Sequence, residues 1–426
     1  MPDNFRDLLV RGVAAAKANQ KDEARFFLEW LLRLDPPEDE CIEAYFWLSE
    51  VSSDLAEKRR FLEEALARRP SDYRARRSLA VLDGRLNPQE IVDSDRLPAQ
   101  AEQGQVEAQR FECPQCGGRL TFTPDGCSLT CEYCSHNQVL ITPQAGKSNG
   151  PAEMDFTVAL ATARGHVRHI NMRSFECQAC AARFLLSPQA MSLTCPYCAS
   201  VYVVDVGETK SLIPPESLIP FAFPTSKAQQ LLQEFLSSRK KRGPITDAIL
   251  HGLYIPVWKF TISGYLPWEG ADYQHGEWET ISGQKLILYD DILVLATHTL
   301  PEVWSEEVRH FDYHMAVPYD SAYLVDWPAE TYQITLSDAS LKARWQALDR
   351  LRKILHQEQA GLMNNLKVNS MDLLIQSFQL VLVPIWIAHL KDEDRRCSVL
   401  INGQSGTIRN KLASSEKRGL LSWLLD

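Results

Sequence analysis

The sequence predicts a multidomain protein. An all-α N-terminal domain of helical hairpins is followed by two small β-rich units and a C-terminal α+β domain with an internal two-fold repeat. Three observations predict this organisation. Small and apolar residues recur with a 34-residue period near the N-terminus, eight cysteines form two identically spaced quartets, and a helical segment leading to a Pro-x-Trp strand occurs twice near the C-terminus. A chain of 426 residues has room for about three domains of ordinary size.

The all-α domain is predicted to span residues 1–88. The segment Leu31–Pro36 returns as Ala65–Pro70 after 34 residues, and Ser71-Asp72 offers an N-cap for a final helix over 73–82. This period resembles the tetratricopeptide repeat (TPR), and the resemblance implies a surface that docks a protein partner. The alternative is a helical bundle that only packs on itself. The expected packing positions are Leu8, Gly12, Ala15, Ala24, Leu28, Leu31 and Pro36.

Each cysteine quartet reads Cys-x2-Cys-x14-Cys-x2-Cys. Two residues between cysteines let a tight turn direct both sulfurs at one ion, and two such turns complete a tetrahedron that leaves no position for water. The sequence therefore predicts two structural Zn²⁺ ions, held by zinc ribbons at residues 111–142 and 175–206. Gly117-Gly118 is expected to take the left-handed turn of the first ribbon, which Ala181-Ala182 adopts less easily in the second. The predicted ligands are Cys113, Cys116, Cys131 and Cys134 in the first ribbon, and Cys177, Cys180, Cys195 and Cys198 in the second.

Disulfide bonds are the main alternative use of these cysteines. Residues 1–10 lack the basic run and apolar core of a signal peptide, so we expect a cytoplasmic protein whose thiols stay reduced. The remaining Cys41, Cys127 and Cys397 are predicted to be plain thiols, since no catalytic base is apparent beside them.

Two polar segments are predicted to connect the domains. Residues 89–110 are rich in Pro and Gln, and residues 143–174 begin with a Pro- and Gly-rich stretch. Such compositions are typical of linkers, so both segments are expected to act as flexible joints.

Residues 207–426 form the predicted α+β domain. Ser282-Gly283 and Asn402-Gly403 are each expected to turn a hairpin after a Pro-x-Trp strand. Because proline cannot donate a backbone hydrogen bond, both Pro-x-Trp strands are expected at a sheet edge or a bulge. The two copies of the repeat are helix 225–241 with strand 254–258, and helix 339–359 with strand 382–386.

The order of these motifs resembles a known family. The segments Ser217–Phe221, 254–258, 382–386 and 401–406, together with the cysteine quartets, resemble bacterial proteins with TFIIB-type zinc ribbons that are often labelled as related to a replication-restart helicase. The resemblance covers residues 111–410 and implies architecture more than activity. The chain lacks the Gly-x4-Gly-Lys-Ser/Thr phosphate cradle, so the helicase label does not fit.

Charge and composition favour a binding protein over a general polyanion binder. The net charge is −10, and residues 111–205 carry six Lys/Arg against seven Asp/Glu. No catalytic constellation is apparent. His310 and His314 lack the third ligand and the Glu of a catalytic metal site, and the basic run 239–242 is most simply the end of a helix.

The function predicted from these observations is a non-enzymatic, zinc-stabilised scaffold or adaptor that docks a protein partner through residues 1–88. One alternative is a nucleic-acid-associated factor that uses ribbon side chains for stacking. Another is a peripheral component of a membrane complex, because relatives often continue into membrane-spanning segments. The apolar stretch 373–390 is interrupted by polar residues and is expected to be buried rather than membrane-spanning. The candidate stacking residues are Phe111, Arg119, Phe175 and Arg183.

Overall fold

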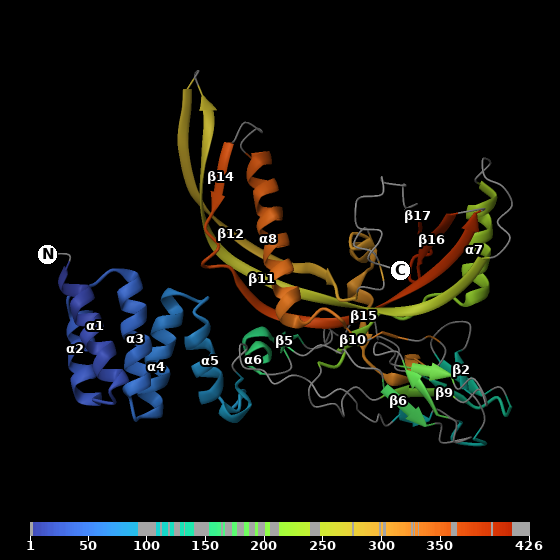
Figure 1. The fold of residues 1–426 in the computed structure, drawn as a ribbon, viewed down its shortest axis with the longest axis horizontal. Coiled ribbons are helices and arrows are strands. Elements are labelled where there is room, and N and C mark those ends of the chain that lie inside the picture. The colour runs from blue at the N-terminus through green and yellow to red at the C-terminus, as the bar shows by residue number, and fades with distance from the viewer. Residues whose placement is uncertain are drawn as a thin grey trace, which may run out of the picture.

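The computed structural model has a helical domain at one end, a long curved sheet that crosses the molecule, and several short strands below that sheet (Figure 1). The described residues are 3–92, 108–110, 113–117, 120–122, 128–131, 133–139, 153–162, 165–166, 173–176, 183–186, 192–194, 201–204, 213–238, 248–274, 277–297, 300, 304–324, 327, 329–330, 332–358, 364–392 and 395–410.

Five helices form the N-terminal domain, as predicted. The helices are α1 (Asp3–Lys17), α2 (Lys21–Arg33), α3 (Glu38–Val51), α4 (Leu55–Arg68) and α5 (Tyr73–Leu82). The contacts run α1 to α2, α2 to α3, α3 to α4 and α4 to α5, with α1 also against α3. The final helix spans the predicted residues, and the carboxylate of Asp72 caps it by accepting hydrogen bonds from the backbone N–H groups of Arg74 and Ala75.

The small and apolar positions that the period identified form the core of these helices. Leu8, Ala15, Ala24, Leu28 and Leu31 are all at most 5% exposed, and Gly12 and Pro36 are buried as well. A Cβ at Gly12 would lie only 2.7 Å from Cδ2 of Leu28. Glycine at this position therefore sets how closely α1 and α2 approach.

Two long antiparallel strands, β11 (Ala248–Gln274) and β15 (Leu374–Asp392), form the centre of the large sheet. The strand order is β12-β11-β15-β10-β13, with β14 added to β11, β5 to β15, and β16 and then β17 along the end of β15. The helices α7 (Thr225–Ser238) and α8 (Leu336–Glu358) precede β11 and β15, and α8 lies within the curve of the sheet (Figure 1). The other strands are β12 (Glu277–Leu295), β10 (Ser217–Leu218), β13 (Val317–Pro318), β14 (Asn364–Val368), β16 (Arg395–Asn402), β17 (Ile408–Asn410) and β5 (Met154–Asp155).

The Pro-x-Trp strands are central rather than edge strands, so that prediction was wrong. The register shift lies between Thr261 and Ile262, not at either proline. Each proline instead faces a gap between two outer segments. Pro384 lies between the part of β15 that pairs with β10 and the part that pairs with β16. Pro256 lies between Val257, which pairs with β12, and Tyr254, which bridges to Ala329. A local gap in pairing tolerates the missing N–H as well as a true edge does.

One of the two predicted hairpin turns is also wrong. Ser282-Gly283 lies within β12, opposite Glu269 and Trp268 of β11. A Cβ at Gly283 would lie 2.9 Å from the Trp268 ring, so the glycine makes room for a cross-strand indole rather than a turn. The turn at Asn402-Gly403 is confirmed. It joins β16 to β17, and the side chain of Asn402 accepts from two backbone N–H groups of the turn.

The described residues of the predicted linkers pack against other parts of the protein. After η1 (Pro88–Glu90), Ile91 bridges to Thr162, so the start of segment 89–110 packs against the chain between the two cysteine quartets. Within segment 143–174, β5 pairs with β15, and α6 (Phe156–Ala161) follows it. Phe156 is 6% exposed and makes edge contacts with two phenylalanines of the sheet. This apolar anchor holds α6 against the sheet.

The cysteine-rich region forms small antiparallel sheets. Around the first cysteine quartet, β2 (Leu120–Phe122), β3 (Ser128–Cys131) and β4 (Asn137–Val139) pair in that order. Further along, β6 (Arg173–Glu176) pairs with β7 (Arg183–Leu186), and β8 (Ser192–Thr194) pairs with β9 (Val201–Val204). The strand β1 (Ala108–Arg110) precedes the first cysteine quartet but pairs with β9, so it connects the two ends of this region.

None of the helices among the described residues combines the length and the apolar character needed to cross a bilayer. The apolar stretch 373–390 lies mostly in β15, where Leu380 to Val383 are all at most 2% exposed. The prediction that this stretch is buried is confirmed.

Candidate metal centre

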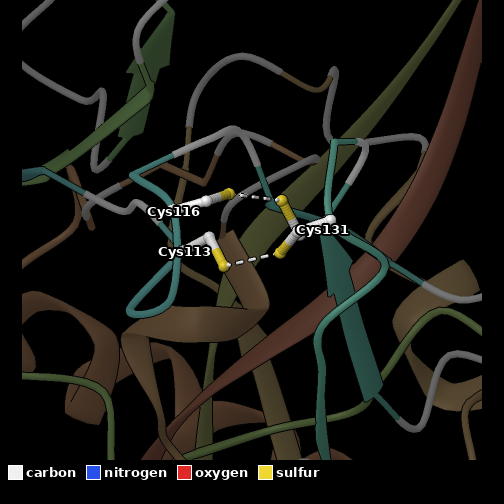
Figure 2. Close-up of side chains that lie close together, drawn as sticks. Cys113, Cys116 and Cys131 are labelled. Carbon is white, nitrogen blue, oxygen red and sulfur yellow. Dashed lines mark hydrogen bonds between the residues drawn. The ribbon is translucent and has the colours of Figure 1, made fainter.

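The four cysteine side chains of the first quartet converge on one point. Figure 2 shows three of them, Cys113, Cys116 and Cys131, facing one another. Cys113 and Cys116 lie in the turn before β2. Cys131 is the last residue of β3, and Cys134 lies in the turn between β3 and β4. Two turns that are distant in sequence are therefore brought together by a three-stranded sheet.

The two turns have the same internal hydrogen bonds. In the first, the Gln115 N–H donates to Sγ of Cys113 (3.4 Å) and the Gly117 N–H donates to the Cys113 carbonyl (2.8 Å). In the second, the Tyr133 N–H donates to Sγ of Cys131 (3.4 Å) and the Ser135 N–H donates to the Cys131 carbonyl (3.1 Å). Each turn thus directs a backbone dipole at a sulfur and stabilises its thiolate form.

Both turns end in a left-handed residue. Gly117 has φ +71°, as its sequence position predicts. Ser135 occupies the equivalent place in the second turn with φ +58°. The sequence did not single out Ser135, because a serine carries no composition signal for this conformation. The turn itself must therefore stabilise a backbone state that non-glycine residues seldom adopt.

The sulfur geometry fits one tetrahedral ion. The Cys113 and Cys134 sulfurs are 3.6 Å apart, the Cys116 and Cys131 sulfurs are 3.4 Å apart, and all four lie within 4.8 Å of one another. A tetrahedron with Zn–S bonds of about 2.3 Å has sulfurs about 3.8 Å apart, whereas a disulfide needs about 2.05 Å. The arrangement can hold a metal ion, and none of these four is in a disulfide.

Two of the four cysteines are buried and two are exposed to solvent. Cys113 and Cys131 are each 2% exposed, while Cys116 and Cys134 are exposed. Hydrogen bonds to its sulfur from the backbone of Cys134 and then Tyr133 lower the pKa of the Cys131 thiol to about 7. A thiol of this kind loses its proton readily to a metal. The four thiolates would fill every position on the ion, so the site suits a structural role rather than catalysis.

The second predicted quartet, Cys177, Cys180, Cys195 and Cys198, lies outside the described residues, as does Cys127. The strands around it are described. Strands start at Leu120, Ser128 and Asn137 around the first quartet, and about 64 residues later at Arg183, Ser192 and Val201. Cys41 is half-buried and donates its S–H to the Pro36 carbonyl (3.4 Å), and burial raises its thiol pKa. It is not part of the cluster.

The other candidate side chains do not assemble into a second centre within the described part of the chain. His310 ends η5 (Glu307–His310) and His314 lies in η6 (Tyr313–Met315), so the two histidines sit on separate turns rather than on one helical face. Nearby, a cavity of about 820 Å³ lies between β12, α8 and these turns. Some of the charged groups that line it are paired with one another, as Arg350 is with Asp291 (2.6 Å) and Lys353 with Asp349 (2.7 Å).

Sequence reasoning did not assign a role to Tyr133. Its side chain is 78% exposed at the tip of the second cysteine turn. The sequence signal for an exposed ring was its position between Cys131 and Cys134, because the sulfurs of such a turn point at the metal and the residues between them face solvent. The predicted stacking residues Phe111 and Arg119, the side chains of Phe175 and Arg183, and the basic run 239–242 lie outside the described residues.

Comparisons with known proteins add one relative. The chain is 23% identical over 222 residues to the uncharacterized protein YdjG of Bacillus subtilis (strain 168). The match covers 46% of this chain and 63% of the relative, so the chain spans less than two thirds of that protein's length. No protein-family model matches the chain. No solved structure matches it either.

Proposed function

We propose that this protein is a non-enzymatic scaffold whose zinc ribbons are stabilised by metal and whose N-terminal helices dock a protein partner. The observation that carries the proposal is the four-sulfur cluster of Cys113, Cys116, Cys131 and Cys134. A tetrahedral set of four thiolates favours Zn²⁺ or an iron–sulfur cluster, and the two closed turns with structural spacing favour Zn²⁺. A second Zn²⁺ in Cys177, Cys180, Cys195 and Cys198 is supported by the equal spacing and by the matching strand positions.

The docking role rests on the N-terminal helices. We assign them to TPR-like hairpins because α1, α3 and α5 begin at Asp3, Glu38 and Tyr73, and α2 and α4 begin at Lys21 and Leu55, which continues the period of about 34 residues. The outer side of α2 exposes a row of apolar side chains. Phe26 is 61% exposed and Trp30 is 42% exposed, with their rings 5.7 Å apart. Contiguous exposed aromatics of this kind are typical of protein interfaces.

We also propose that the C-terminal domain contains two copies of one unit. In each copy a helix precedes a long central strand with Pro-x-Trp, and a hairpin returns from the far end of that strand as β12 or β16. The two central strands pair antiparallel with Pro256 opposite Leu382 and Tyr254 opposite Pro384, which is close to the two-fold relation that a duplication would produce. This arrangement supports the resemblance to bacterial TFIIB-type zinc-ribbon proteins.

Two measurements test the scaffold proposal. Metal analysis of the full chain should give two zinc ions per molecule, and a value near zero would remove its basis. Affinity capture of native partners should then be compared between the natural chain and the double variant Phe26→Ala/Trp30→Ala. The control is Leu55→Ala, because Leu55 is 68% exposed but lies at the start of α4. Loss of the same partner with both variants would contradict docking through α2.

Nucleic-acid association is the second candidate, and the exposed Tyr133 ring favours it. An aromatic ring beside a rigid metal centre can stack on a base, and such stacking is worth about 1–3 kcal/mol per base. The nearly balanced charge of residues 111–205 argues against strong phosphate binding. Binding of single-stranded DNA or RNA at physiological salt, weakened by Tyr133→Ala, would support this candidate over the scaffold.

A further inference from the structure

The large sheet ends in a free edge. In sheet order β12 is the terminal strand, and within the described part of the chain it pairs with β11 alone. The β11–β12 hairpin projects from the body of the molecule (Figure 1). A free strand edge presents a row of unpaired backbone N–H and C=O groups, and such a row is a template for another strand.

The outer face of this hairpin is apolar. Tyr265 of β11 lies opposite Leu286 of β12, and Leu288 lies two residues further along the same face. These side chains are 55%, 70% and 68% exposed. Three neighbouring apolar side chains at an unpaired edge form a patch that would gain stability from being covered.

The inner face is already covered by α8. The guanidinium of Arg350 lies 4.4 Å from the ring centroid of Tyr289 and donates to Asp291 (2.6 Å). Lys285 pairs with Glu358 at the end of the same helix (2.6 Å). Only the edge and the outer face of the hairpin are therefore left for another molecule.

A bulge limits the length of the free edge. Phe260 lies opposite Ile292 and Ile262 lies opposite Tyr289, so Asp290 and Asp291 both fall opposite the single residue between them in β11. Bulges end regular pairing at sheet edges. Past the bulge, Leu293 and Leu295 belong to a separate buried cluster with residues 300–311. Any added strand must therefore stop at the two aspartates.

We propose that two copies of this chain associate by antiparallel pairing of their β12 strands about a two-fold axis at Ile287. This axis places Leu286 of each copy opposite Leu288 of the other copy. Tyr265 of each copy lies next to its own Leu286 on the same face. Gln284 falls opposite Asp290 and Lys285 opposite Tyr289, so no charge faces a like charge. The pairing extends over residues 283–291 and ends at the bulge on both sides.

The sequence of the edge selects the second copy and this register. A two-fold axis through a residue keeps outer side chains opposite outer side chains. Moving the axis to Leu288 would place Leu286 opposite Asp290, and moving it to Leu286 would place Leu288 opposite Gln284. Only the axis at Ile287 matches each leucine with the other, which makes the strand self-complementary.

Sedimentation of the full chain, over about 1–100 µM, tests the proposal. The natural chain should form a dimer, and Leu286→Arg/Leu288→Arg should weaken association at least tenfold. The matched control Leu55→Arg should remain dimeric, because Leu55 is equally exposed but lies in the N-terminal helices. A natural chain that stays monomeric throughout, or a double variant that dimerises as before, would overturn the proposal. Tight binding of a different protein along this edge by a monomeric chain would overturn it as well.

Cross-linking tests the register. Leu286→Cys and Leu288→Cys chains are oxidised separately and as a mixture, with the unsubstituted chain as background. Residue 286 lies opposite residue 288 of the second copy, so the mixture should form more disulfide-linked dimer than either variant alone. Equal or greater cross-linking within one variant would place the axis elsewhere and refute the proposed pairing.

Discussion

Replacing Cys113 by serine is the sharpest test of the metal centre. Cys113 is 2% exposed, its sulfur lies 3.6 Å from that of Cys134, and it belongs to the cluster in which all four sulfurs lie within 4.8 Å. A serine hydroxyl keeps its proton at neutral pH, so the variant removes one thiolate ligand while changing side-chain volume very little.

The expected magnitude follows from the ligand count. Structural zinc contributes about 10–16 kcal/mol at neutral pH, so each of four thiolates accounts for roughly 2.5–4 kcal/mol. Loss of one should weaken apparent zinc affinity by roughly 60- to 1,000-fold. Against a chelator of intermediate affinity, the Cys113→Ser chain should retain one zinc where the natural chain retains two.

The assay combines metal analysis with cobalt substitution. Cobalt in a four-thiolate site gives intense thiolate-to-metal absorption, and the variant should lose about half of it if both cysteine quartets bind metal. Cys41→Ser is the control, since a serine there can keep the hydrogen bond to the Pro36 carbonyl and should leave both signals unchanged. Unchanged zinc content and cobalt absorption in Cys113→Ser would refute the assignment of this ligand.

Three further outcomes are expected. Gly12→Ala should destabilise the helical domain by about 1–3 kcal/mol in denaturant unfolding, because its Cβ would lie 2.7 Å from Leu28, and an unchanged midpoint would contradict the close packing. Phe156→Ala should cost about 3–5 kcal/mol and should increase hydrogen exchange in β5, whereas an effect below about 1 kcal/mol would mean that the connector is not anchored there. Burial raises the pKa of Glu216 to about 7, so the folded state holds its proton more tightly than the unfolded state does. Stability from this group is present below about pH 4.5 and is lost as the pH rises to about 7; Glu216→Gln should flatten that slope in thermal melting, and an unchanged slope would exclude this group as its source.

Local sequence signals correctly predicted the elements that are stabilised by residues close to them in the sequence. The Asp72 cap, the packing positions of α1 and α2, and the turn at Asn402-Gly403 depend on contacts within or between adjacent elements, and all three appear in the structure. The first cysteine quartet was also predictable, because metal geometry imposes its spacing on the chain.

Long-range pairing explains the errors. The role of Gly283 depends on Trp268, which faces it across the β11–β12 pair, so Ser282-Gly283 reads as a turn when taken alone. The strand β5 and helix α6 were missed because a two-residue strand and a six-residue helix are too short to show a clear period. The order of β5 comes from β15, more than 200 residues later in the chain, where Ser377 lies opposite Asp155.

The contacts that the helical domain makes with the connector and the large sheet have a consequence for proteolytic cleavage. Arg85 donates to Asp155 (2.8 Å), the Val92 N–H donates to the Ala161 carbonyl (3.0 Å), and Ser71 lies within hydrogen-bond reach of Asp372 (3.4 Å). Non-covalent contacts therefore hold the helical domain against the rest of the protein, in addition to the covalent connection along the backbone. A protease that nicked the chain between residues 93 and 107 would produce two fragments that migrate together until a denaturant separates them.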